Sequence, residues 1–136
     1  MSILVCGGAG YIGAHVVRLL RQRGDRVVVV DDLSTSNAAR IGDTPLVRLD
    51  VATDEARSVL SNLMVDEDVT AVIHFSARKQ VGESVARPAW YYQQNIGGMA
   101  NVLAAMEDAG VDQMIFSSSA AVYGIPTAEV VTEDMA

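Results

Sequence analysis

The first residues that could do chemistry form a glycine-rich loop. Gly7, Gly10 and Gly13 are spaced G-x-x-G-x-x-G, between an apolar run and a segment with helical periodicity. Glycines there let the backbone turn tightly, approach a pyrophosphate and pack the following helix close to a sheet. The helix N-terminus then offers free N–H groups to the anion. A plain strand-to-helix turn is the alternative, but it rarely needs three such glycines, so the loop predicts dinucleotide binding.

A pair of carboxylates, Asp31 and Asp32, follows the next β-branched run. A carboxylate about 20 residues beyond such a loop can accept hydrogen bonds from a ribose 2′-hydroxyl. Two carboxylates would repel a 2′-phosphate, and no Lys or Arg lies between them and Arg40 to receive one. The pair therefore predicts NAD rather than NADP. Asp32 taken alone could equally be a solvated loop residue.

A third carboxylate, Asp50, ends another short apolar run and is followed by Val51. At that edge of a nucleotide-binding sheet, a carboxylate can accept the exocyclic amine of adenine, and a valine can give apolar contact. Asp50 could also cap the start of the next helix. The two roles are compatible.

The elements that must position these residues alternate along the chain. Gly24 and Gly110 are natural helix stops, Pro88 suits a first helical turn, and Thr53 or Asp54 could cap a helix. Strands followed by helices imply a parallel sheet with right-handed crossovers, so the sequence predicts one Rossmann-like, doubly wound α/β domain over 1–136. The predicted strands are 2–6, 27–30, 45–49, 71–75 and 113–117, and the predicted helices are 11–23, 54–64 and 88–109.

Composition excludes several functional classes. The net charge of −7 argues against a nucleic-acid-binding or anionic-membrane surface. Cys6 is the single cysteine and predicts a small core residue in a reducing compartment. The start of the chain has no signal-peptide pattern and the longest Val run is too short to span a bilayer, so a cytoplasmic protein is expected. His15 and His74 lack metal-ligand spacing, and no metal site is expected.

Six blocks of the sequence resemble the extended short-chain dehydrogenase/reductases, and among them the UDP-glucose 4-epimerase family. They are VCGGAGYIGAH, VVDDLSTS, LDV, VIHFSARKQVGESV, YYQQNIGGMANVL and FSSSAAVYG. They occur in family order and cover nearly the whole chain. The DDLSTS and KQVGESV segments are more specific than the glycines, and they favour the epimerases over other branches.

The resemblance implies NAD as cofactor and a particular set of contacts. Lys79 is the charged candidate for a hydrogen bond to the cofactor. Asn95 would reach the cofactor from the long helix or brace a loop, and Arg78 is expected to be a surface charge. The cofactor-binding residues expected from the glycine loop, the carboxylates and the resemblance together are Gly7, Gly10, Tyr11, Ile12, Gly13, Asp31, Asp32, Leu33, Ser34, Thr35, Ser36, Asp50, Val51, Phe75, Ser76, Ala77, Lys79 and Asn95.

The implied family reaction is an internal redox cycle on a UDP-sugar. A hydride leaves C4 of the hexose for NAD, the ring turns, and the hydride returns to the other face. Ser119 would bind the sugar 4-hydroxyl, and the tyrosine of a Y-x-x-x-K motif would remove its proton. No tyrosine here is followed four residues later by lysine. We therefore expect the catalytic helix and sugar-nucleotide domain to lie beyond Ala136, and the chain alone to be inactive.

Two other functions stay open. A nucleotide-sugar dehydratase would carry an acidic pair where this chain has Ala120 and Ala121, which disfavours that branch. A non-catalytic NAD-binding module is favoured by the missing Tyr and Lys and disfavoured by Ser119.

The resemblance also implies homodimerisation through the long helix. Apolar faces left bare by a missing helix would promote self-association.

Overall fold

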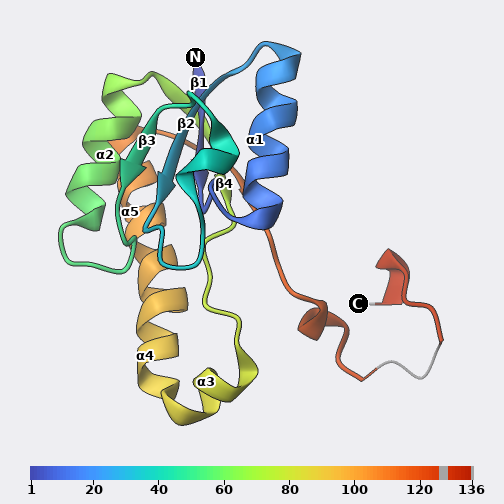
Figure 1. Cartoon of the computed structure of the whole chain (residues 1–136). Helices are drawn as coiled ribbons and strands as arrows, with labels where there is room; N and C mark the ends of the chain where they lie inside the picture. Colours follow the sequence, from blue (N-terminus) through green and yellow to red (C-terminus); the bar gives the residue numbers. More distant parts are fainter. Residues whose placement is uncertain (126–128, 136) are drawn as a thin grey trace.

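A parallel five-stranded sheet forms the centre of the computed structural model, which describes residues 1–125 and 129–135. Its strands lie in the order β3-β2-β1-β4-β5, with every neighbouring pair parallel. This is the order of a doubly wound dinucleotide-binding fold, so the predicted Rossmann-like class is confirmed (Figure 1). The strands are β1 (Ser2–Cys6), β2 (Arg26–Asp31), β3 (Leu46–Arg48), β4 (Val69–His74) and β5 (Gln113–Phe116).

Helices cover both faces of the sheet. Helix α1 (Tyr11–Arg23) and the 3₁₀ turn η1 (Ala38–Ile41) lie on one face, and α2 (Ala56–Asp66) and α5 (Gly98–Ala109) lie on the other (Figure 1). Successive side chains of a strand point to opposite faces. Val5 and Val29 accordingly pack in the α1 layer, whereas Leu4 and Val28 pack in the α2–α5 layer.

The helix ends predicted from glycines agree with the structure, whereas the helix start predicted from a capping residue does not. Gly24 and Gly110 end α1 and α5 in the left-handed conformation, with φ of 93° and 70°. The predicted cap of α2 is wrong, because that helix begins at Ala56 after Glu55 and has no side-chain cap. The Thr53 hydroxyl instead donates to the Asp50 carbonyl.

The predicted long helix is continuous but is not one regular α-helix. It consists of α4 (Pro88–Tyr92), a π-helical turn η2 (Gln93–Gly97) and α5, with Pro88 in the first turn as expected. Four short elements were not predicted, because each is too short for hydrophobic periodicity to define it. They are η1, α3 (Val81–Ala86), η3 (Ala120–Tyr123) and η4 (Glu133–Met135).

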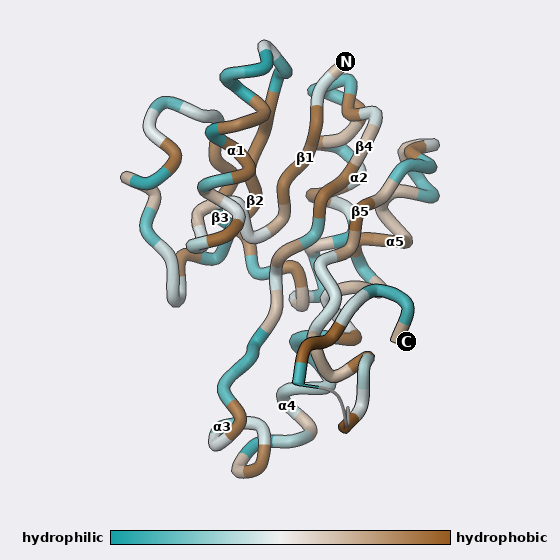
Figure 2. Tube along the Cα trace, turned by 90° about the vertical axis from the view of Figure 1, so that its right-hand side faces the viewer, coloured by the Kyte–Doolittle hydropathy of each residue, from teal (hydrophilic) through white to brown (hydrophobic). Residues whose placement is uncertain are grey.

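Apolar side chains remain uncovered beside β5 and along the long helix. Ile115 and Phe116 are 64% and 56% exposed, and Ile96 and Leu103 are also exposed. Figure 2 shows apolar stretches in β5 and in the segment that leaves the sheet after it. This agrees with the expectation of bare apolar faces. Within the described residues, no helix is both long enough and apolar enough to cross a membrane.

The buried His74 predicts a specific pH dependence of stability. Burial lowers the pKa of His74 below its usual 6.5, and its Nδ1 has no hydrogen-bond partner among the described residues. The folded chain thus binds fewer protons than the unfolded chain. The free energy of unfolding should therefore fall as the pH drops below about 6.5, by at most about 1.4 kcal/mol per pH unit, until the pH reaches the folded-state pKa.

Replacing His74 with phenylalanine should make the free energy of unfolding depend less on pH between about pH 6.5 and 5. Carboxylates with a pKa of about 4 become protonated only below this range. Urea unfolding of both proteins across this range checks the prediction. Both proteins retain His15, so the difference between their curves reports His74. Parallel curves would contradict the assignment.

Candidate functional site

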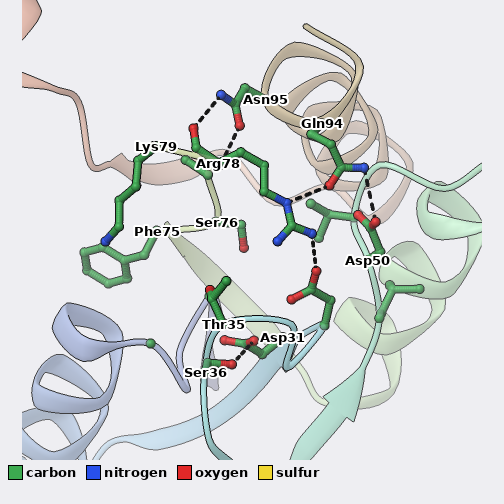
Figure 3. Close-up of a pocket in the computed structure, with 16 residues that line it drawn as sticks. Asp31, Thr35, Ser36, Asp50, Phe75, Ser76, Arg78, Lys79, Gln94 and Asn95 are labelled. Atoms are coloured by element: carbon green, nitrogen blue, oxygen red, sulfur yellow. Dashed lines mark hydrogen bonds and ion pairs between the residues drawn. The ribbon is translucent and has the colours of Figure 1, made fainter. Parts of the chain in front are cut away.

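A cleft opens at the carboxyl ends of the strands, where the chain order of the sheet reverses between β1 and β4 (Figure 3). Ligands of open α/β sheets bind at this position. The empty space is about 650 Å³, including the part open to solvent. The lining residues are Gly7, Gly10, Asp31, Asp32, Thr35, Ser36, Leu49, Asp50, Val51, Phe75, Ser76, Ala77, Arg78, Lys79, Gln94 and Asn95.

The glycine loop forms one wall of the cleft and tolerates no side chain at two positions. Gly7 has φ of +75°, and a Cβ there would lie 2.8 Å from the Ser76 nitrogen. A Cβ on Gly13 would lie 2.3 Å from the Gly7 carbonyl oxygen. The first turn of α1 contains no acidic residue, and its N-cap Gly10 has no side chain to occupy the free N–H groups. The loop therefore presents donors and a positive dipole end to an anion.

Asp31 is a buried carboxylate at the end of β2. It is 6% exposed and accepts hydrogen bonds from the Ala9 nitrogen (3.0 Å), the Leu33 nitrogen (2.9 Å) and the Ser36 hydroxyl (2.6 Å). Asp31 thus ties the glycine loop to the loop after β2 and keeps an anionic face in the cleft. It is the group best placed to accept ribose hydroxyls.

Arg78 is not the surface charge that the sequence suggested. Its side chain is 18% exposed, and its guanidinium forms an ion pair with Asp32 at 2.5 Å. It also donates to Gln94 Oε1 (Figure 3) and to the Ser34 hydroxyl. Burial raises the pKa of Asp32, but hydrogen bonds from Ser34 and the charge of Arg78 outweigh it and leave the pKa below its usual value. Asp32 is therefore a paired site residue and not a solvated loop acid.

Of the two roles considered for Asp50, the structure shows the capping one, and the adenine contact stays a prediction. Its Oδ1 accepts the Ala52 nitrogen at 2.9 Å, which caps the turn before α2, and its Oδ2 accepts Gln94 Nε2 at 3.2 Å in the cleft. Together with the Arg78 bonds, this forms a polar chain from Asp32 through Arg78 and Gln94 to Asp50. The chain connects the ends of β2, β4 and β3 with the π turn.

Asn95 braces the loop after β4. Its Oδ1 accepts the Arg78 nitrogen at 2.7 Å, and its Nδ2 donates to the Arg78 carbonyl at 2.9 Å. The amide therefore satisfies both backbone groups of one residue. Of the two roles left open for Asn95, the geometry supports the loop-bracing one directly, while the side chain also lines the cleft.

Removing this brace with Asn95→Ala should lower the free energy of unfolding by about 1–3 kcal/mol, because two backbone groups lose their partners. It should also weaken NAD binding, because the loop carrying Arg78 and Lys79 is no longer fixed. Urea unfolding and calorimetric titration measure the two effects. Gln93→Ala, in the same turn but exposed, is the matched control and should change neither quantity. Equal stability of the two variants would contradict the bracing role.

Comparison with known proteins assigns this arrangement to a family. Residues 3–136 match the sequence profile of the NAD dependent epimerase/dehydratase family. The chain belongs to this family.

Curated relatives of this family member are UDP-glucose 4-epimerases. That of Lactobacillus helveticus is 44% identical over 134 residues, which cover 98% of this chain and 40% of the relative. That of Bacillus subtilis is 42% identical over 139 residues, covering 98% of this chain and 41% of the relative. The chain thus spans about 40% of the length of these relatives.

Solved epimerase structures superpose on nearly the full length of this chain. The Stenotrophomonas maltophila UDP-glucose 4-epimerase, crystallised with NAD and formylated UDP-arabinopyranose, has a TM-score of 0.88 and 44% identity, covering 98% of this chain and 41% of that one. The NAD complex of the Brucella ovis UDP-glucose 4-epimerase has a TM-score of 0.88 and 39% identity, covering 98% and 40%.

Not every predicted site residue of this epimerase/dehydratase domain reaches the cleft. Ser119 is exposed, accepts the Ala121 nitrogen at 3.3 Å and caps η3, so the structure does not join it to the cofactor cleft. Tyr11 and Ile12 are exposed at the start of α1. The predicted residues outside the cleft lining are Tyr11, Ile12, Gly13, Leu33, Ser34 and Ser119.

Three cleft residues of the family domain were missing from the predicted set: Leu49, Arg78 and Gln94. Gln94 precedes Asn95 in the π turn, and Leu49 precedes Asp50, so adjacency to predicted site residues was the available signal.

Burial raises the pKa of the Cys6 thiol to about 12, with a smaller contribution from Asp31, which fits a core residue and not a nucleophile. Within residues 1–125 and 129–135, no three His, Cys, Asp or Glu side chains form a potential metal cluster.

Proposed function

We propose that this chain binds NAD in the cleft and forms the cofactor-binding portion of a UDP-glucose 4-epimerase. The observation that carries the proposal is the buried Asp31 beside the glycine loop, at the point where the strand order reverses. Relatives named UDP-glucose 4-epimerase and epimerase structures containing NAD support it. UDP-hexose interconversion in galactose metabolism, in the cytoplasm and by a homodimer, is part of the same proposal.

Different residues of the cleft would contact different parts of NAD. The N–H groups opening α1 hold the diphosphate, Asp31 accepts the ribose hydroxyls, and Asp50 accepts the adenine amine. Lys79 lines the cleft and has no ion-pair partner among the described residues, so its ammonium is available to the cofactor. When bound, NAD supplies a hydride acceptor and donor for C4 of the sugar. Ser119 is the residue that the family resemblance implies for binding the 4-hydroxyl.

The pure 136-residue chain is expected to show no steady conversion of UDP-galactose. No tyrosine in it has a lysine four residues later, so the general base must come from outside these residues. A positioned acid or base contributes about 10²–10⁴-fold. A coupled assay for UDP-glucose measures the rate. Sustained turnover proportional to protein concentration would refute the prediction.

Calorimetric titration of NAD into the chain tests the proposal, followed by titration of UDP-galactose into the complex. We expect NAD to bind. The missing Tyr-x-x-x-Lys pattern also favours a second candidate, a non-catalytic NAD-binding module. The nucleotide sequence after the codon for Ala136 distinguishes the two: a continuing frame with this motif supports the enzyme, and a stop codon supports the module. A chain that does not bind NAD would exclude both.

A further inference from the structure

Arg78 occupies a position that the cofactor-binding residues alone do not explain. It follows β4 (Figure 3), yet its guanidinium reaches the loop after β2. There Nη2 pairs with Asp32 Oδ2 at 2.5 Å, and Nη1 donates to the Ser34 hydroxyl. Asp32 is 26% exposed at its side chain, so the pair is partly shielded from solvent. The guanidinium therefore sits beside the end of β2 that carries Asp31.

The end of β2 is where folds of this class read the 2′-position of the adenosine ribose. A carboxylate there accepts the 2′-hydroxyl of NAD, and a nearby arginine accommodates the 2′-phosphate of NADP. This cleft contains both features, because Asp31 is the buried acceptor and the guanidinium of Arg78 pairs with the adjacent residue, Asp32. Arginine also suits the task, since its planar donors match phosphate oxygens bidentately.

We propose that Arg78 is a specificity-determining residue for the 2′-position, an inference that rests on the proposed binding of NAD. Asp32 holds the guanidinium when the ribose carries a hydroxyl, and a 2′-phosphate competes with Asp32 for it. The cleft therefore discriminates against NADP less sharply than the same cleft with Asp31 and Asp32 but without Arg78. NAD remains preferred, because the carboxylates of Asp31, Asp32 and Asp50 outnumber the cations of Arg78 and Lys79 in the lining.

A second cation near Asp32 provides the matched control. Arg48, at the end of β3, donates from Nε to the Asp32 backbone carbonyl at 3.3 Å, but it is exposed and is not part of the cleft lining. Arg48→Leu removes the same charge from the same neighbourhood as Arg78→Leu. Only the latter should change selectivity.

The experiment is calorimetric titration of NAD and NADP into the wild type, Arg78→Leu, Asp32→Asn, the double variant and Arg48→Leu. We expect Arg78→Leu to raise the ratio of the NADP to the NAD dissociation constant about tenfold, the scale of one charge-assisted contact. Asp32→Asn should lower that ratio about tenfold, and adding Arg78→Leu should reverse most of the gain, leaving only the part due to the lost repulsion between Asp32 and the phosphate. Arg48→Leu should leave it unchanged.

Each contrary result overturns the inference. Equal weakening of both cofactors in Arg78→Leu would reduce Arg78 to a structural residue. A gain in Asp32→Asn that survives Arg78→Leu undiminished, or a shift in Arg48→Leu, would assign the 2′-position to another group. If Arg78→Leu does not fold, Arg78→Gln keeps polar contacts, removes the charge and must give the same ratio. A wild type that binds neither cofactor defeats the proposed function itself, whereas NAD binding with an unchanged ratio defeats only this inference.

Discussion

Replacing Gly13 with alanine is expected to abolish NAD binding and to lower the free energy of unfolding by about 3 kcal/mol, the upper part of the range for overpacking. The added Cβ would lie 2.3 Å from the Gly7 carbonyl oxygen and 2.8 Å from the Gly8 Cα. Both are backbone atoms, so a flexible side chain cannot relieve the clash. Helix α1 must move away from the loop, and its N–H groups then no longer converge on the diphosphate.

Urea unfolding and calorimetric titration measure the two losses. Gly97→Ala is the matched control, because its Cβ would meet only the Gln93 side chain, at 4.0 Å, and its backbone is helical. The free energy of unfolding of that variant should equal that of the wild type or exceed it by up to about 1 kcal/mol, since alanine is the better helix former. If Gly13→Ala matched the wild type in stability and affinity, the close approach of helix and loop would be disproved.

Replacing Asp31 with asparagine is expected to raise the dissociation constant of NAD about 100-fold and to lower the free energy of unfolding by about 1–3 kcal/mol. The carboxylate accepts three hydrogen bonds, including two from the backbone nitrogens of Ala9 and Leu33. An asparagine has one oxygen, so its amide must face a donor on one side. The substitution also removes the negative charge offered to the ribose hydroxyls.

Asp43→Asn serves as the control, because it removes one carboxylate charge at a side chain that is 85% exposed and outside the cleft. It should leave NAD affinity unchanged. Calorimetry provides the affinities, and urea unfolding separates loss of binding from loss of the fold. An Asp31→Asn variant with wild-type affinity would place the ribose elsewhere.

The sheet could be predicted from the sequence because its signals are local. Each strand is a short apolar run, and the alternation of strands with helices admits few parallel topologies. The bounds predicted for β1 and α1 agree with the structure, and Gly24 ends α1 as expected. The acid at the end of β2 was predictable for the same reason, since its distance from the glycine loop is set by one helix and one strand.

Residues whose roles depend on distant partners could not be predicted. Arg78 and Asp32 are 46 positions apart, and only the fold brings them together. An arginine in a polar loop is usually exposed, so its burial through pairing has no signature of its own. The π turn was missed because α4, with five residues, is too short for hydrophobic periodicity to reveal a shift after it. The resemblance singled out Asn95 in this turn but not Gln94.

The π turn has a consequence for how this helix can vary. One wide turn shifts the following residues by one position relative to a regular α-helix, a rotation of about 100°. Gln94 and Asn95 can therefore point into the cleft while Gly98 lies against Val51 and Val102 stays in the core. Deleting a single residue between Tyr92 and Gly98 would restore regular α-helical winding and keep α4 and α5 in register, but it would turn the amides of this turn away from the cleft. The wide turn therefore separates two properties of the helix, because the amides of Gln94 and Asn95 in the cleft depend on it while the packing of Gly98 and Val102 does not.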